Sequence, residues 1–235
     1  MTRRARIAVF VPALAGLAAL FLWGFAGIPD FGHYRGPYGF VLNRIVVPDR
    51  HTTNVVGATV FDVRGVDTMG EEFILFAAVM GVVLLLRSGG AVPDDDPVPR
   101  FPPIRFGVLA TGACVLVGVW LVAFGYVTPG GGFQGGIAVA AGALVLYLAT
   151  NFRHFEPFAD ETILDPLEAT GAGGYVVVGL AALVSGAPFL HNLLGPGQSG
   201  TVMSGGSIAF LNWAAAVEVA AANLVLFAEF LKEQA

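Results

Sequence analysis

The feature that most restricts the fold of this chain is a series of long apolar segments separated by polar stretches. A helix needs about 20 apolar residues to cross a bilayer. Hydrophobic residues make up 56% of the 235 residues and charged residues only 12%, more apolar surface than a soluble domain of this size could bury. We therefore predict an all-α integral membrane protein with about six transmembrane helices, over residues 7–28, 70–87, 106–127, 133–151, 172–190 and 207–231.

Two of these segments are less regular than the others. Segment 7–28 follows three arginines and is longer than the apolar core of a signal peptide, which has about 7–15 residues, so a retained helix is expected. Segment 70–87 contains fourteen consecutive residues without charge, FILFAAVMGVVLLL. It reaches bilayer length only if the preceding Thr-Met-Gly-Glu-Glu is included. This inclusion places Glu71 and Glu72 at, or just inside, the membrane boundary.

The distribution of Lys and Arg predicts the orientation of the chain. With the N-terminus inside, eight of the 12 basic residues fall on the cytoplasmic side, and the other four share the outer loop 29–69. We expect a multi-pass protein of the plasma membrane with both termini cytoplasmic. Proline and aspartate make 88–103 an extended linker between a two-helix unit, 1–87, and a four-helix unit, 104–235. The second cytoplasmic connector, 151–170, is expected to be a surface loop or a short interfacial helix.

Composition excludes several classes of function. A single cysteine, Cys114, rules out an internal disulfide framework and provides no cluster ligands. The four histidines are spread over different loops, so no metal or haem site is expected. The sequence contains no basic patch that would indicate nucleic-acid binding. We predict neither a cofactor nor a metal.

Glu218 is the most informative polar residue, because it lies near the middle of the last apolar stretch, 204–230. A carboxylate at that depth costs about 2.5–3.5 kcal/mol on insertion scales, so it is usually paired or faces a polar path. Alanines one helical turn away predict tight packing on its side. Burial favours the protonated carboxyl, which suits proton handling. The alternative is a protonated glutamate bonded to a neighbouring helix.

A second group of acids stands at the start of the second span. The apolar spacing of 55–63 predicts a short helix at the membrane surface, followed by a turn at Arg64-Gly65. Asp67, Glu71 and Glu72 then form a polar cluster at the boundary. Carboxylates and backbone carbonyls are the hard oxygen donors that Na⁺ prefers, so one glutamate is expected to face an ion route. The alternative is capping acids that are wetted by solvent or paired with Arg64.

Two further features carry candidate residues. His191, near the end of the fifth span, is a candidate for a proton exit, or else an interfacial hydrogen-bonding residue. The third and fourth spans are joined by a glycine-rich turn, in which proline stops the incoming helix and glycines permit positive φ. Its amides could bind an anion, but a tight structural hairpin is the reading we favour. The turn consists of Pro129, Gly130, Gly131, Gly132, Gly135 and Gly136.

Several of these segments resemble a known family. Asn-Val-Val…Phe-Asp-Val-Arg-Gly-Val-Asp-Thr-Met-Gly-Glu, within 52–87, is similar to the C-terminal part of the A subunit of Mrp-type cation/proton antiporters and to a small subunit of membrane-bound hydrogenases. GYVTPGGGFQGGIAVAAGALVLYLA (125–149) and GAPFLHN (186–192) resemble the MnhB/MrpB family. The resemblance implies a small, non-enzymatic subunit of a multi-subunit Na⁺/H⁺ antiporter, with Na⁺ and H⁺ as transported ions. Its expected partners are large antiporter-like subunits, small membrane subunits and the lipid bilayer.

Other classes of function remain open at this point. The chain can be an accessory subunit of an ion-pumping redox complex, in which case iron–sulfur or nickel subunits would co-purify. It can be a self-contained transporter, which predicts ion flux from the purified chain. It can also be a pure scaffold, in which every intramembrane acid is replaceable. The outer segment 29–50 has no counterpart in the resemblance.

Overall fold

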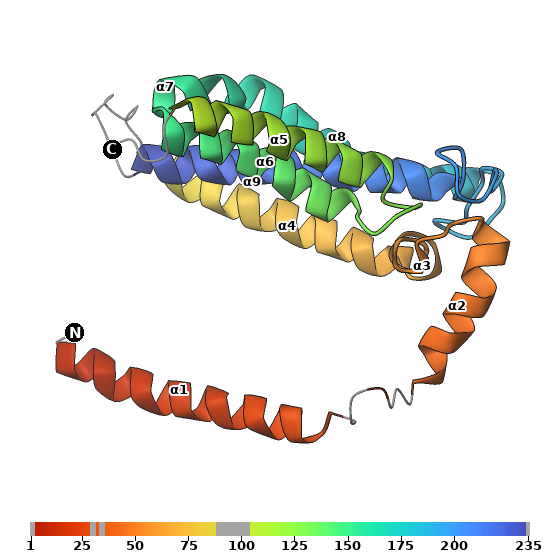
Figure 1. Cartoon of the computed structure of the whole chain (residues 1–235), viewed down its shortest axis with the longest axis horizontal. Helices are drawn as coiled ribbons and strands as arrows, with labels where there is room; N and C mark the ends of the chain where they lie inside the picture. The colour runs from red at the N-terminus through yellow and green to blue at the C-terminus, as the bar shows by residue number, and fades with distance from the viewer. Residues whose placement is uncertain (1–2, 29–31, 33–35, 88–103, 234–235) are drawn as a thin grey trace. The chain divides into compact units, whose positions relative to one another are not determined.

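The computed structural model describes residues 3–28, 32, 36–87 and 104–233 (Figure 1). The predicted linker 88–103 lies outside the described residues. The chain divides into two compact units, Met1–Val41 and Leu42–Ala235. The first contains helix α1, Arg3–Ala26, whose apolar stretch Phe10–Ala26 is shorter than the other spans. A crossing by α1 therefore stays a prediction.

The second unit is a helical bundle. Five of its helices are long and apolar enough to cross a membrane, which confirms the predicted class of fold. In the described part of the chain, the only β pairing is an isolated bridge between Gly197 and Ser204. The five helices are α4 Gly65–Leu86, α5 Ile104–Ala123, α6 Gly132–Ala149, α8 Glu161–Val184 and α9 Ser207–Glu233.

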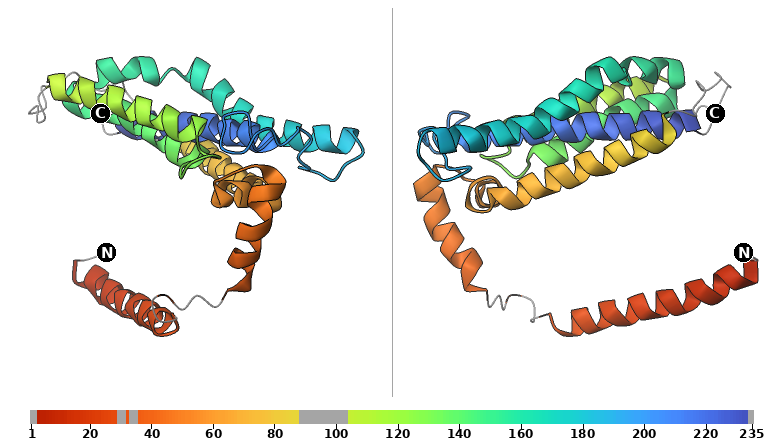
Figure 2. Two further views of the ribbon diagram at one scale, coloured as in Figure 1. Left: turned by 45° about the vertical axis from the view of Figure 1, so that its right-hand side comes forward. Right: turned by 180° about the vertical axis from the view of Figure 1, so that it is seen from behind.

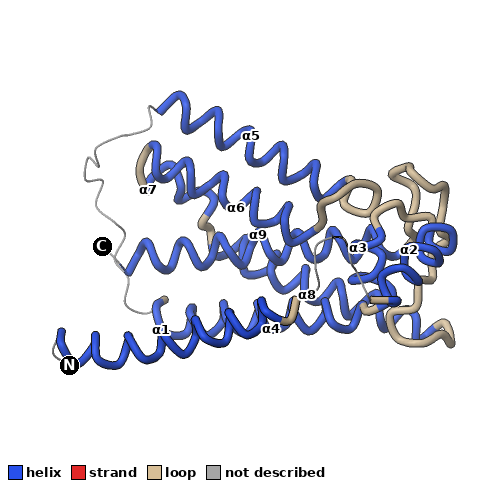
Figure 3. The backbone as a smooth tube through the Cα atoms, turned by 60° about the horizontal axis from the view of Figure 1, so that its bottom comes forward, coloured by secondary structure: helices blue, strands red, loops and turns tan. Residues whose placement is uncertain are grey.

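Helix α9 is the centre of the bundle. It packs against α4, α6 and α8, while α5 packs mainly on α6 (Figures 2 and 3). Of its most apolar stretch, 56% is buried, against 17% for α4 and for α5. The outer faces of α4 and α5 are apolar and exposed, as expected for helices in contact with lipid. The buried face of α9 is therefore surrounded by protein and not by lipid.

The helices approach each other through small residues. A Cβ added at Gly118 of α5 would lie 2.7 Å from the carbonyl oxygen of Gly135 on α6, and one at Gly135 would lie 2.6 Å from that of Gly118. Contacts this short leave no room for a side chain at either position. Glycine at these positions therefore permits close helix packing, as is common in membrane bundles.

The bundle has two ends, which we name after the short helices found there. The α3 end carries α3 Val55–Ala58, the π-helix η1 Thr59–Val63, the α5–α6 turn and the α8–α9 loop. Part of α2, Pro37–Arg50, also packs at this end through Val46. The α7 end carries α7 Phe152–Phe155, the 3₁₀ turn η2 Glu156–Phe158 and the C-terminal ends of α4 and α9 (Figure 1).

The predicted short helix and the turn before α4 are present. Asn54 caps α3 by accepting hydrogen bonds from the amides of Val56 and Gly57, at 3.1 and 3.2 Å. Arg64 then leaves helical geometry, with φ −129° and ψ 36°. Helix α4 begins at Gly65, earlier than the predicted residue 70, so Glu71 and Glu72 lie in its second turn.

The connector 151–170 differs from the expectation. Only its first part is a short helix and turn, and residues 161–170 are the first turns of α8. Asp160 starts this helix by accepting a hydrogen bond from the amide of Thr162 at 2.9 Å. Pro166 is accommodated within the helix. The three acids of 161–170, expected on a loop, are therefore fixed on a long helix, and Glu168 among them is buried.

Asn212 of α9 ties three elements together at the α3 end. Its amide donates to the carbonyl of Val122 at 2.6 Å, and its Oδ1 accepts from the amide of Gly132 at 2.7 Å. Asn212→Ala would leave both buried backbone groups without these partners. We expect a loss of about 2 kcal/mol or more of stability, measured as a lower thermal midpoint in detergent. Asn223→Ala is the control, because the Asn223 amide bonds only its own helix at the carbonyl of Val219. Equal midpoints for the two variants would contradict this role.

Candidate ion-pathway site

Glu218 lies in the middle of α9 and is fully buried in protein. Helix α8 comes so close at this level that a Cβ added at Gly171 would lie 2.6 Å from both the backbone nitrogen and the Cβ of Glu218. Neither carboxyl oxygen of Glu218 meets a hydrogen-bond donor among the described residues. The residue therefore has the protein environment that its position in the sequence required, but no donor in the described structure that satisfies it.

Glu72 of α4 is the partner of Glu218. It is also fully buried, and α4 packs along α9. The two carboxyl groups lie against one another and interact electrostatically. None of their four oxygens has a donor at hydrogen-bonding geometry in the described part of the chain. Two like groups in a dry site cannot both ionise without a large cost, so the arrangement favours protonation of at least one of them.

Helix α8 adds two polar side chains that sequence reasoning missed. Glu168 is 2% exposed, and its Oε1 is buried without a hydrogen-bond partner. Its carboxyl interacts electrostatically with Glu218. Tyr175 is fully buried on the other side, where its hydroxyl interacts with Glu72 and Thr68. We call Glu72, Glu218 and Glu168 the acid row, since each interacts with the next across the α4, α9 and α8 interfaces.

The acid row ends at a group of charged side chains at the α7 end, which we call the charge cluster. Arg87 donates two hydrogen bonds to Asp165, at 2.8 and 3.1 Å. Lys232 donates to Glu161 at 2.6 Å and lies 3.8 Å from Glu229. Hydrogen bonding to Asp165, together with the nearby acids, raises the pKa of Arg87 above its ordinary value. The cluster consists of Arg87, Glu161, Asp165, Glu229 and Lys232.

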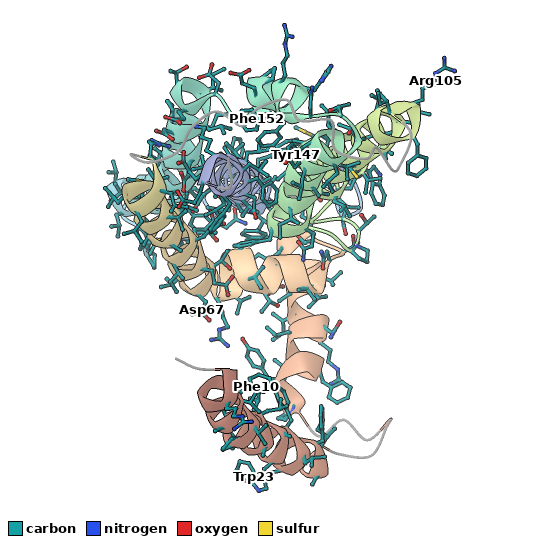
Figure 4. The ribbon with its side chains drawn as sticks, turned by 90° about the vertical axis from the view of Figure 1, so that its left-hand side faces the viewer. Phe10, Trp23, Asp67, Arg105, Tyr147 and Phe152 are labelled. Carbon is teal, nitrogen blue, oxygen red and sulfur yellow. The ribbon has the colours of Figure 1, made fainter. Side chains whose placement is uncertain are left out.

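Three predicted candidates lie elsewhere. Asp67 is exposed on the outside of α4 and forms an ion pair with Arg64 (Figure 4). Glu71 is exposed and lines a cavity of about 190 Å³ together with Thr68 and the glycine-rich turn. His191 is exposed in the loop after α8. The structure thus joins Glu72 to Glu218 and leaves these three at the α3 end.

The glycine-rich segment divides between turn and helix. Gly130 and Gly131 form the turn, with φ of 157° and 152°, values that other residues rarely adopt. Gly132, Gly135 and Gly136 lie in the first turns of α6. A Cβ at Gly136 would lie 2.8 Å from the carbonyl oxygen of Ala216 on α9. The segment therefore sets the packing of α6 against α5 and α9.

A signal for Glu168 was present in the sequence. Glu161, Asp165 and Glu168 recur at i, i+4 and i+7, the spacing of one helix face, directly before an apolar run. The prolines of this segment suggested a loop instead. Among the described residues, no group of three or more His, Cys, Asp or Glu side chains is placed to hold a metal. Carboxyl groups such as those of the acid row can hold and transfer protons.

Fold and site together define a multi-pass membrane protein with a buried row of acids. Residues 106–225 match the family described as a domain related to the MnhB subunit of Na⁺/H⁺ antiporter. The chain belongs to this family, and the resemblance to the MnhB/MrpB family stated above is confirmed. The matched residues include Glu168 and Glu218, whereas Glu72 precedes them.

Two solved structures and one curated protein are similar over most of the chain. An uncharacterized protein of Methanocaldococcus jannaschii is 30% identical over 202 residues, covering 76% of this chain and 74% of that protein. A chain of an archaeal membrane-bound sulfane sulfur reductase, a respiratory membrane complex, has a TM-score of 0.75 and 26% identity, covering 97% of this chain and 99% of that one. A chain of the Mrp complex from a Dietzia species has a TM-score of 0.74 and 22% identity, covering 99% of this chain and 26% of that one. At that identity the last likeness shows the fold alone.

Proposed function

We propose that the chain is an integral subunit of a multi-subunit cation/proton antiporter of the plasma membrane, and that its acid row is part of the proton route. The family supports the class of complex. The observation that carries the route is the contact between Glu72 and Glu218, two fully buried carboxyl groups without a donor among the described residues. Large and small antiporter subunits are the proposed partners.

The row has the properties that proton transfer requires. Each buried carboxyl can be neutral with its proton or charged without it, and neighbouring carboxyls can pass a proton between them. The dry interior of the bundle solvates the charged form poorly, and intramembrane acids of this kind are expensive and usually functional. The row also crosses three helices, from Glu72 near the α3 end to Glu168 near the α7 end. A structural role alone would be served better by apolar side chains.

The test is replacement of each acid by its amide, which keeps shape and removes the exchangeable proton. We expect Glu72→Gln, Glu218→Gln and Glu168→Gln each to lower Na⁺-dependent proton exchange of the assembled complex at least tenfold in everted vesicles. Glu156→Gln, at an exposed acid of η2, is the control and should exchange as the wild type. Wild-type exchange in all three row variants, with normal assembly, would leave only the scaffold function.

A redox complex is the second candidate assembly. The observation that favours it is the match to the sulfane sulfur reductase chain, at 26% identity over nearly the whole length of both chains. In that setting the same acid row would serve ion movement driven by a redox partner. Affinity purification separates the two assemblies, because only the redox complex would bring down iron–sulfur subunits.

A further inference from the structure

One arginine joins all three helices that carry the acid row. Arg87 directly follows the last residue of α4, and its guanidinium is held by Asp165 of α8 through two hydrogen bonds. Its Nε lies 3.4 Å from Oε1 of Glu229 on α9, and 3.4 Å from Oε2 of Glu161 on α8. Two parallel bonds to one carboxylate are a geometry that lysine cannot reproduce.

The position of Arg87 is at the end of the row. Asp165 precedes Glu168 by three residues, so the two acids share a face of α8. Glu168 interacts electrostatically with Asp165 and Arg87 on one side and with Glu218 on the other. An ion leaving the row at the α7 end therefore passes the charge cluster.

The cluster already contains its own cations. Asp165 is paired with Arg87, whereas Glu161 and Glu229 each lie within ion-pair distance of both Arg87 and Lys232. Glu229 is almost completely buried, so solvent does not compete for its charge. A mobile Na⁺ would have to displace a guanidinium or an ammonium that is tethered to the same bundle. Tethering gives these groups a high effective concentration, which favours them over a free ion.

We propose that Arg87 determines the ion specificity of the α7 end: as a tethered cation it occupies the carboxylates that a metal cation would need, so protons pass and Na⁺ does not. The inference rests on the proposed function, because it assumes that the acid row conducts. Three carboxylates against two cations leave one negative charge in the cluster. A proton can neutralise that charge on a carboxyl oxygen without displacing either tethered cation.

The experiment removes the tethered cation in the intact complex. Vesicles containing the complex are given a Na⁺ gradient at equal pH on both sides, and the sodium leak is measured as the uptake of radioactive sodium that is not accompanied by proton release from the vesicles. We expect Arg87→Gln to raise this uptake at least tenfold over the wild type, and Arg87→Lys, which keeps the charge, to stay within about twofold of it. Arg153→Gln is the control, because Arg153 is an exposed cation on α7 at the same end but outside the cluster. Its uptake should equal that of the wild type.

The double variant Arg87→Gln/Glu168→Gln tests whether the leaking sodium ions pass along the acid row. If they do, the sodium leak of the double variant should return to the wild-type level. A leak that persists in the double variant would show that Arg87 only holds the helices together, and would overturn the proposal. Unchanged sodium uptake in assembled Arg87→Gln would overturn it as well. If Arg87→Gln does not assemble, Lys232→Gln is measured in its place. We expect it to raise the sodium leak about threefold, and an unchanged leak would likewise overturn the proposal. Failure of the proposed function is seen separately, as wild-type exchange in the three row variants.

Discussion

Gly171→Ala is expected to separate α8 from α9 and to abolish exchange. The added Cβ would lie 2.6 Å from the backbone nitrogen of Glu218 and 2.8 Å from the carbonyl oxygen of Ala214. These are backbone atoms of the central helix, which cannot turn aside as a flexible side chain would. Overpacking of a tight core costs about 1–3 kcal/mol and occasionally more. Here the helices that move apart also carry Glu168 and Glu218, so the acid row is interrupted.

Gly173→Ala provides a matched control in the same helix. A Cβ at Gly173 meets nothing within 4 Å. Alanine is preferred to glycine in a helix by about 1 kcal/mol, so this variant should be as stable as the wild type or slightly more stable. The measurements are the thermal midpoint of the purified protein and the exchange rate of the assembled complex. Equal behaviour of the two alanine variants would mean that α8 and α9 do not meet closely at Glu218.

The helices of the bundle could be predicted because each consists of an apolar run of bilayer length. Their ends could not, and α8 is the clearest example. Its first ten residues contain three acids and a proline, which read as a connector by local composition. Their helical form is supported because two of those acids, Asp165 and Glu161, face cations from other elements, Arg87 at the end of α4 and Lys232 of α9. A local sequence pattern cannot predict ion-pair partners that lie more than 70 residues away along the chain.

The sequence indicated some residues of the candidate site, but not which of them meet in the fold. Glu218 and Glu72 stand out because each is a charged-type side chain in or next to an apolar run. That they meet each other was not predictable, since periodicity does not decide which faces of α4 and α9 come together. Asp67 and Glu71 looked equivalent to Glu72 in sequence. The direction of each residue around α4 separates them, because Glu72 turns toward α9 while Asp67 and Glu71 turn outward.

Replacing both members of the central pair, Glu72→Met/Glu218→Met, is expected to raise stability while abolishing exchange. The wild-type bundle holds four buried carboxyl oxygens without donors among the described residues. A buried polar group left unsatisfied costs about 1–3 kcal/mol. Replacement of buried ionic groups by apolar side chains of similar volume often stabilises a protein by about 1–4 kcal/mol. Methionine is flexible enough to fill the space of glutamate without new polar atoms.

The measurements are the thermal midpoint of the assembled complex, which should rise, and proton exchange in vesicles, which should fall below detection. The single variants Glu72→Met and Glu218→Met are needed beside the double one, since each leaves a lone carboxyl facing an apolar partner. A lone carboxyl is forced to stay protonated, so each single variant should also lose exchange but gain less stability. A double variant that lost stability would show that the pair holds α4 to α9. In that case the cost of burying two acids is already offset by contacts between them, and the acids would be structural members of the bundle.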